Sequence, residues 1–415
     1  MRRAIFTGFS PNLEWSDAFL AWRIFFQPWR WRKGNVAKAL EARIRQDFTI
    51  RYAVAFESGR TSLTTLLQTS GLAAGDEVAL QAYTCVAVPN AVLWAGLKPI
   101  YIDCLRDTLT MSPRDVEKKI TPRTKAIIIQ YTFGQVGALD EILKIAREKN
   151  LIVIEDCAHV IGGKHHGQLL GTVGDASFFS FGRDKVISGV FGGMALTNND
   201  DWGKRLRAAE EKYNFPDYLW IWQQINHPIV TMKAKLLYRI GLGKVIFRVA
   251  QKLHWISKTV VPAERNGKKP PFVFRKMPNA LARLTLHQYE KLERFNTHRK
   301  SIGKWYREKL RGNQTYELLR EEEESIPLRF FVQVENPNDL IRFAKKESIY
   351  LGDWYNEAVA PTGVQYERIG YQEGSCPVAE ELAKHSVNLP VDIHSGEKEA
   401  KRVIDTLQKY SEEKK

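Results

Sequence analysis

The sequence predicts an α/β fold: a mostly parallel β-sheet covered by helices on both faces, followed by a smaller C-terminal α/β unit. Two observations support this fold class. Aliphatic runs alternate with helical segments between residues 50 and 200, and the runs lack the polar alternation of a sheet with one wet face. Sites in such sheets gather at the C-terminal ends of the strands. Candidate catalytic and binding residues are therefore expected at those ends.

The predicted elements follow one another in a regular order. A helix is expected over residues 35–47, a strand and a helix in YAVAFESGRTSLTTLLQTSGL, and a strand, a helix and a strand in EVALQAYTCVAVPNAVLWAGLKPIYIDC. Further strands are expected at KAIIIQ, LIVIED, ASFFSF and GGMALTN, and ALDEILKIAREKN reads as a helix between the first two of these strands.

A second α/β pattern begins near residue 276. It opens with one amphipathic helix, LARLTLHQYEKLERFNTHRKSIGKWYREKL, and continues with a strand at LRFFVQV, a helix at NDLIRFAKKESI and a last helix around EKEAKRVIDTLQKY. We predict an N-terminal arm at residues 1–35, a large domain at 36–275 and a small capping domain at 276–415.

Composition places the chain among globular proteins of the cytoplasm. Its 415 residues are 44% hydrophobic and 26% charged, which suffices for two packed domains. No apolar run reaches the roughly eighteen residues of a membrane span, and MRRAIFTGFSPNLEW lacks the features of a secretory signal. The four cysteines are widely spaced, so neither a disulfide framework nor a metal site is expected.

The net charge of +15 is concentrated in two segments that are rich in aromatic residues. Between Leu219 and Ala263 there is no Asp or Glu, and Lys and Arg alternate there with Trp and aliphatic residues. AFLAWRIFFQPWRWRKG, near the start, has the same character. Seven of the eleven tryptophans lie in these two regions: Trp15, Trp22, Trp29, Trp31, Trp220, Trp222 and Trp255.

This pattern has three interpretations. Tryptophan suits the headgroup layer of a membrane and basic residues suit anionic lipid, which favours peripheral contact with the inner face of the membrane. Alternatively, the segments pack on the body of the protein or on a twin subunit. A nucleic-acid partner comes third and is not expected, because no recognition module is visible.

Three predicted strand ends carry reactive or phosphate-binding groups. The first leads into Ser58-Gly59-Arg60-Thr61 at a helix start, where free N–H groups favour a phosphate, although a serine there most often only caps the helix. The second is Asp156, and the third leads into the loop SFGRDKVISGVFGG, with Ser180 and Lys185.

Pyridoxal phosphate needs this combination of groups. It requires an amine for a Schiff base, an acid at its pyridine nitrogen and donors for its phosphate, roles that Lys185, Asp156 and Ser180 with the Gly59 turn can fill. Taken alone, Lys185 reads as a solvent-facing loop lysine and Asp156 as a helix cap. Their joint occurrence at neighbouring strand ends favours the cofactor.

The sequence resembles the DegT/DnrJ/EryC1/StrS family of sugar aminotransferases, which have the aspartate aminotransferase type of fold. The resemblance runs from about residue 36 to the C-terminus, apart from a basic insertion at about 203–270. The landmarks stand here as SGRTSL, AYTCVAV, GLKPIYIDC, TKAIIIQYTFGQ, VIEDCAH, GDASFFSFGRDK, GGMALTN, ALARLTLHQYEKLERFNTHR and HSVNLPVDIHS.

Carried over by position, the resemblance implies a role for each matching residue. Lys185 is the Schiff-base lysine, Asp156 the partner of the pyridinium nitrogen, Ser180 a phosphate-binding serine, and His159 a residue beside the cofactor ring. The phosphate turn is formed by Gly59, Arg60 and Thr61.

Several positions depart from the family pattern. Cys85 replaces an aromatic residue over the ring, so stacking passes to Tyr83 or is lost. Val273 replaces an Asn that reaches the phosphate from a second subunit, while Arg275 is retained and is a candidate for substrate contact or a simple surface arginine. The bulky Arg60 either adds charge to the phosphate or points to solvent.

The implied function is a pyridoxal-phosphate-dependent aminotransferase that works as a homodimer. It moves an amino group from an amino acid, by resemblance glutamate, to a keto-sugar carried on a nucleotide, in glycan or amino-sugar biosynthesis. The alternatives are a non-catalytic protein that keeps this fold as a binding or assembly module, and a pyridoxal-phosphate-dependent sugar lyase. The insertion is expected to bring the enzyme to a membrane.

Overall fold

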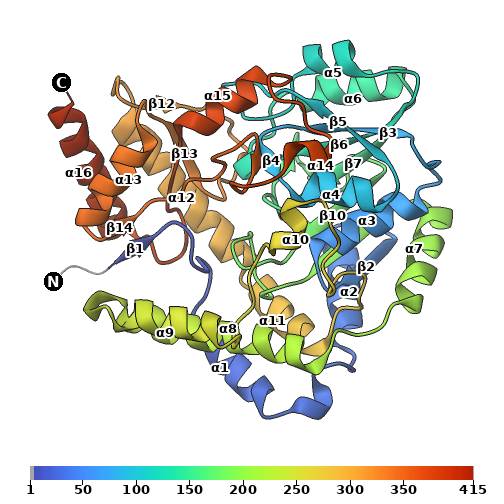
Figure 1. Ribbon diagram of the computed structural model, residues 1–415, viewed down its shortest axis with the longest axis horizontal. Coiled ribbons are helices and arrows are strands. Elements are labelled where there is room, and N and C mark those ends of the chain that lie inside the picture. The colour runs from blue at the N-terminus through green and yellow to red at the C-terminus, as the bar shows by residue number, and fades with distance from the viewer. Residues whose placement is uncertain (1–3, 415) are drawn as a thin grey trace.

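The central sheet carries seven strands in a computed structural model that describes residues 4–414 (Figure 1). In spatial order they are β2 (Tyr52–Phe56), β11 (Gly193–Thr197), β10 (Ala176–Ser180), β7 (Ile152–Asp156), β6 (Thr124–Gln130), β3 (Glu77–Gln81) and β5 (Lys98–Ile102). All neighbours are parallel except β11, which is antiparallel to both β10 and β2. The predicted fold class, α/β with a mainly parallel sheet, is confirmed.

Strand register brings the predicted strand ends to one edge. Because β11 runs against both of its neighbours, β2 and β10 point the same way as β7. Gly193 lies opposite both Phe56 and Ser180, and Phe178 lies opposite Asp156. The ends of β2, β10 and β7 therefore deliver Ser58, Ser180 and Asp156 to the same side of the sheet.

Helices bury both faces of this sheet, which explains the continuous aliphatic runs. On β6, Ile127 and Ile129 join one core cluster, whereas Ala126 and Ile128 join the other. The helices of this part are α2 (Val36–Asp47), α3 (Gly59–Thr69), α4 (Ala87–Trp94), α5 (Pro113–Lys119), α6 (Leu139–Glu148) and α7 (Asp200–Lys212). The short elements β4 (Thr84–Cys85), η2 (Thr132–Gly134), β8 (Lys164–His165) and β9 (Gln168–Leu169) complete it.

The C-terminal part has its own antiparallel sheet and its own core cluster. The sheet has the order β12 (Glu317–Leu318), β13 (Phe330–Gln333), β16 (Ser386–Leu389). Helices α12 (Leu292–Leu310), α13 (Pro337–Lys346) and α16 (Glu397–Glu413) share its core cluster, whereas α11 (Asn279–Tyr289) packs on α2 and α14 (Tyr366–Ile369) on α4. Helix α15 (Pro377–His385) leads directly into β16. Two further strands, β14 (Ile349–Tyr350) and β15 (Val359–Ala360), pair with β1 (Ile5–Phe6) and β4.

The single long helix predicted at the start of this part is two helices. Lys291 leaves the helical conformation between α11 and α12, with φ −99° and ψ 0°. Its amine donates to Ser16 Oγ (2.8 Å) and Asp17 Oδ1 (2.9 Å) of the N-terminal segment. No Pro or Gly marks this break, so it depends on a contact between residues far apart in sequence.

A layer of helices along the lower edge of Figure 1 contains the aromatic and basic segments. Helix α1 (Trp15–Phe25), followed by η1 (Pro28–Arg30), packs on α8 (Tyr218–Leu237), and α8 packs on α9 (Leu242–Lys252) beyond η3 (Tyr238–Ile240). The short α10 (Pro262–Arg265) follows. In the described part of the chain, no helix is long and apolar enough to span a bilayer.

Candidate active site

A pocket opens where the strand ends meet, and seven of the predicted site residues line it: Gly59, Arg60, Cys85, Asp156, His159, Ser180 and Lys185. Trp354 and Tyr355 from the C-terminal part and Thr259 and Val260 from the segment after α9 also line it. These last four were not predicted, because the sequence pattern around each of them is that of an ordinary loop.

Lys185 and His159 are hydrogen-bonded to each other inside this pocket. Lys185 Nζ lies 2.9 Å from His159 Nε2, and the Phe133 N–H donates to His159 Nδ1 over 3.2 Å. Because Nδ1 accepts, the neutral ring carries its hydrogen on Nε2 and donates it to the lone pair of the amine. Burial lowers the pKa of both Lys185 and His159, which favours this uncharged pair. Burial therefore shifts the lysine toward its unprotonated, nucleophilic form.

Asp156 is a buried carboxyl group at the end of β7. Its Oδ1 accepts the Ala158 N–H at 3.0 Å, and within residues 4–414 its other oxygen has no hydrogen bond. Burial raises the pKa of Asp156 to about 6, while the Ala158 N–H and the charge of Lys185 act to lower it. This carboxyl group is still mostly ionised at neutral pH and can accept a hydrogen bond from a protonated ring nitrogen.

The turn after β2 is arranged around buried Glu57. Ser58 caps α3 by accepting the Thr61 N–H (3.3 Å), and the Ser58 and Thr61 hydroxyls both donate to Glu57 Oε1. Thr61 is fully buried, its hydroxyl is used by Glu57, and it is not among the residues that line the pocket. Burial raises the pKa of Glu57 to about 7.

Gly59 and Ser180 form a narrow cradle beside the turn. A Cβ atom added at Gly59 would lie 2.9 Å from Ser180 Cβ and 3.1 Å from its Oγ. Only glycine allows the backbone to approach Ser180 this closely. The start of α3 therefore presents backbone N–H groups and one hydroxyl group together, which suits a phosphate.

Two arginines, Arg60 and Arg183, attach the end of the predicted insertion to the site. Arg60 Nε lies 2.5 Å from buried Glu264, and Arg60 Nη2 donates to Thr259 O over 2.7 Å. Arg183 donates to Ser257 O and Ser257 Oγ, both at 2.7 Å, and to Gln224 Oε1 at 3.1 Å. We call residues 256–264 the strap, because these contacts hold them across one side of the pocket.

The N-terminal segment braces the loop that carries Lys185. Asn12 Nδ2 donates to Lys185 O (2.7 Å) and Val186 O (2.9 Å). Buried Arg299 from α12 donates to Asn12 Oδ1 and Val186 O, both at 2.6 Å. The backbone beside the lysine is therefore fixed from two directions.

Aromatic residues surround His159, but they are not the ones the sequence suggested. Tyr83 is fully buried and hydrogen-bonds Ser386 Oγ at 2.5 Å, and it is absent from the pocket lining. Trp354 and Tyr355 instead lie with ring centroids 6.2 Å from His159, both close to parallel with it. Cys85 lines the pocket without supplying an aromatic face.

Val273 and Arg275 lie outside the pocket lining of this single chain. Val273 is buried, while Arg275 is partly exposed and its guanidinium makes a long contact with Pro271 O (3.4 Å). The Arg275 backbone N–H donates to Glu57 Oε2 at 3.0 Å, so this segment supports the phosphate turn through its main chain.

One group of side chains with metal-ligand chemistry lies apart from the pocket, although no metal site was predicted. The ligand atoms of Asp140, His165 and His166 lie within 4.8 Å of one another. Both imidazoles hydrogen-bond Asp140, at 3.0 and 3.1 Å, and so tie the β8–β9 hairpin to α6. These bonds give the group a structural role.

Comparison with known proteins shows the family. The family model described as the DegT/DnrJ/EryC1/StrS aminotransferase family matches residues 23–236 and 250–408. The chain belongs to this family. The only unmatched internal stretch, 237–249, is shorter than the insertion expected at 203–270, and α7 within that range packs on β2 and α3 as an ordinary covering helix.

Individual relatives match different shares of the chain. A GDP-perosamine synthase of Escherichia coli O157:H7 is 37% identical over 46% of this chain and 52% of its own length, so the chain spans about half of this relative. A pleiotropic regulatory protein of Geobacillus stearothermophilus is 26% identical over 91% of this chain and 90% of its own.

Solved structures share the fold. The Bacillus subtilis protein ntda, solved with bound cofactor PMP, has a TM-score of 0.74 at 21% identity and covers 99% of this chain and 86% of its own. A DegT DnrJ EryC1 StrS aminotransferase of Brucella abortus has a TM-score of 0.72 at 20% identity, with 95% of each chain covered.

Proposed function

We propose that the protein is a pyridoxal-phosphate-dependent aminotransferase that transfers an amino group from an amino acid to a keto-sugar. The proposal rests on the hydrogen-bonded Lys185–His159 pair, which lies in the same pocket as Asp156 and the Gly59–Ser180 cradle. The family name and the PMP bound in a relative of the same fold support it.

The residues of the pocket fit this cofactor. The free oxygen of Asp156 suits the ring nitrogen, the Gly59–Ser180 cradle suits the phosphate, and the buried amine of Lys185 suits the aldehyde. When bound, pyridoxal phosphate supplies an electron sink for the charge left when a proton leaves the substrate carbon. Lys185 would move that proton, its burial favours the unprotonated amine beforehand, and Asp156 would favour a protonated ring nitrogen.

Two relatives suggest the nature of the acceptor. Their names are GDP-perosamine synthase and UDP-N-acetyl-3-dehydro-alpha-D-glucosamine 3-aminotransferase, both of which point to nucleotide-linked sugars. We propose a keto-sugar of this class as acceptor and glutamate as the donor. No feature of the pocket favours a lyase or a binding module, and a buried lysine hydrogen-bonded to His159 serves no evident purpose in the latter.

We also propose that the protein acts as a homodimer and contacts a membrane. The family resemblance supports the dimer, because the family completes its site across two subunits. In a dimer, Arg275 and the segment around Val273 are available to the neighbouring site. The aromatic and basic composition of α1, α8 and α9 supports the membrane contact.

The first half-reaction tests the activity without knowledge of the sugar. Protein loaded with pyridoxal phosphate is expected to convert glutamate to about one equivalent of 2-oxoglutarate per site in the absence of an acceptor. Lys185→Ala is expected to form none, whereas Lys144→Ala, which changes an exposed lysine of α6, keeps the full yield. Absence of keto acid from glutamate, glutamine and aspartate alike would refute the proposal.

A further inference from the structure

The most exposed large apolar side chains of residues 4–414 all lie in one layer of helices. They belong to α1, η1, α8, η3, α9 and the residues just after α9: Trp15, Phe19, Trp22, Phe26, Trp29, Tyr218, Leu219, Leu236, Ile240, Leu242, Val245, Val249, Leu253 and Trp255. We call their combined surface the docking face. Soluble proteins rarely leave so much apolar surface in water unless it binds something.

Helix α9 shows that this exposure is patterned. Leu242, Val245, Val249 and Leu253 follow one another at helical spacing and are all exposed, from 45 to 54%. The opposite side of α9 already packs against the protein, because Gly243 and Ala250 are buried there. Basic residues flank the exposed stripe. A helix with a packed side, an outward apolar stripe and a basic border suits a membrane interface.

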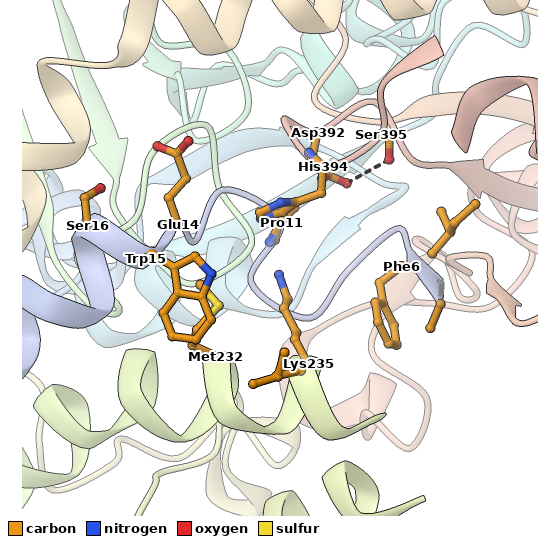
Figure 2. A pocket seen from close by; sticks show the side chains of 13 residues that line it. Phe6, Pro11, Glu14, Trp15, Ser16, Met232, Lys235, Asp392, His394 and Ser395 are labelled. Carbon is orange, nitrogen blue, oxygen red and sulfur yellow. Dashed lines mark hydrogen bonds between the residues drawn. The ribbon is translucent and has the colours of Figure 1, made fainter. Parts of the chain in front are cut away.

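A recess opens in the docking face between α1 and α8. This cavity of about 640 Å³ has Phe6, Trp15, Met232 and Leu236 among its walls, with Lys235 at its polar side. Figure 2 shows the Trp15 indole ring beside Met232 and the Lys235 side chain rising from α8 into the same space. The carboxylates of Glu14 and Asp392 also line the recess, where Glu14 pairs with Lys291 and Asp392 accepts the His394 N–H. The apolar walls of the recess suit part of a lipid tail.

The charge of the docking face favours a lipid over a second copy of the chain. Residues 219–263 contain no acid, and the acidic residues of the α1 region are engaged: Lys291 contacts both Glu14 and Asp17. A two-fold contact would place this basic face against itself, and like charges would repel. Anionic lipid headgroups supply the opposite charge, and tryptophan prefers the headgroup layer.

The strap joins the docking face to the active-site pocket. Trp255 belongs to the face and is 49% exposed, while Thr259 and Val260 line the pocket. Between them, Ser257 is held by Arg183, and Thr259 is held by Arg60. A surface bound at Trp255 therefore lies only a few residues from the wall of the pocket.

We propose that the docking face binds the surface of an anionic phospholipid bilayer and that this binding, through the strap, places the active-site pocket at the membrane. This inference rests on the membrane contact proposed above and specifies its surface, its lipid class and its link to the pocket, whereas it does not depend on the proposed amino transfer. Its failure and the failure of that activity are thus measured separately.

Vesicle flotation tests the docking. The full-length protein is expected to float with vesicles of phosphatidylcholine and phosphatidylglycerol and to remain mostly soluble with phosphatidylcholine alone. The tryptophan emission is expected to shift to shorter wavelength on binding, because four tryptophans of the docking face are exposed to water in the free protein: Trp15, Trp22, Trp29 and Trp255. Lys185→Ala is expected to bind as wild type does.

Charge reversal on α9 isolates the lipid contact. The pair Arg248→Glu and Lys252→Glu is expected to weaken binding at least about 25-fold, since each basic side chain at an anionic surface contributes about fivefold. The control pair Lys401→Glu and Lys409→Glu makes the same charge change on exposed positions of α16 and is expected to leave binding within about twofold. Equal binding by the two pairs would overturn the proposal.

Replacement of two apolar side chains of α9 distinguishes lipid binding from self-association of the chain. Val249→Ser with Leu253→Ser is expected to lower vesicle binding at least tenfold and to leave the mass of the soluble protein unchanged. The proposal would be overturned if the wild type did not bind vesicles and the variant dissociated from dimer to monomer. That result would show that the docking face is an interface between two copies of the chain.

Discussion

Burial controls the charge state of individual side chains around the site. It lowers the pKa of the Lys185 amine and raises that of Asp156 to about 6 and that of Glu57 to about 7. The first shift favours a nucleophilic amine, and the second leaves a carboxylate ready for a ring nitrogen. The shift at Glu57 has no catalytic purpose, so it offers a clean test of the buried phosphate turn.

Glu57→Gln is expected to change how stability depends on pH. The folded carboxyl group holds its proton up to about pH 7, whereas the unfolded one releases it near its usual value of 4.5. The folded state therefore binds more protons between these values, and the free energy of unfolding falls by about 3 kcal/mol as pH rises through that window. The glutamine variant lacks this decline.

Urea unfolding at about pH 5 and about pH 8 measures both proteins. Titratable groups common to both proteins cancel when their free energies of unfolding are subtracted. The wild type should then be increasingly more stable than the variant as pH falls. A difference that does not change with pH would show that Glu57 titrates normally and is not buried as described.

At the scale of elements, the strap and the N-terminal segment turn loops into a rigid site. Asn12 fixes the main chain beside Lys185, and Arg183 binds both the strap and α8. Neither contact was predicted, because each joins residues far apart in sequence. Arg183 and Ser257 differ by 74 positions, and Asn12 and Lys185 by 173.

Arg183→Met is expected to release the strap. The change removes the hydrogen bonds to Ser257 and Gln224 from a buried position, at a cost of about 2 kcal/mol in local stability. Trypsin cleavage after exposed Lys258 should then rise about 30-fold, since it follows the population of the open strap. Arg205→Met, on the exposed side of α7, is the matched control. Unchanged cleavage in Arg183→Met would show that the arginine does not hold the strap.

At the scale of the whole molecule, the sequence predicted what local patterns determine. The aliphatic strands β6, β7 and β10 were found in order, and the rule of strand ends led to Asp156 and Ser180. The fold class and the family are confirmed. The three-part domain division stays a prediction, and so do the roles of the individual site residues.

Contacts between residues far apart in sequence determine the features that were not predicted. The break between α11 and α12 depends on contacts of Lys291 with α1, and the aromatic lining comes from Trp354 and Tyr355, which only the folded chain brings to His159. Arg60 was assigned to the phosphate turn, and its side chain is also paired with Glu264 of the strap. No local pattern carries such information.

The most direct test of the central claim is to locate the cofactor bond. Protein loaded with pyridoxal phosphate is reduced with borohydride, digested and mapped by mass spectrometry. We expect a phosphopyridoxyl group on the peptide that contains Lys185 and, in Lys185→Ala, no comparable labelling of any peptide. Labelling spread over exposed lysines, or equal labelling of both proteins, would contradict the account of the pocket as a pyridoxal phosphate site built on Lys185.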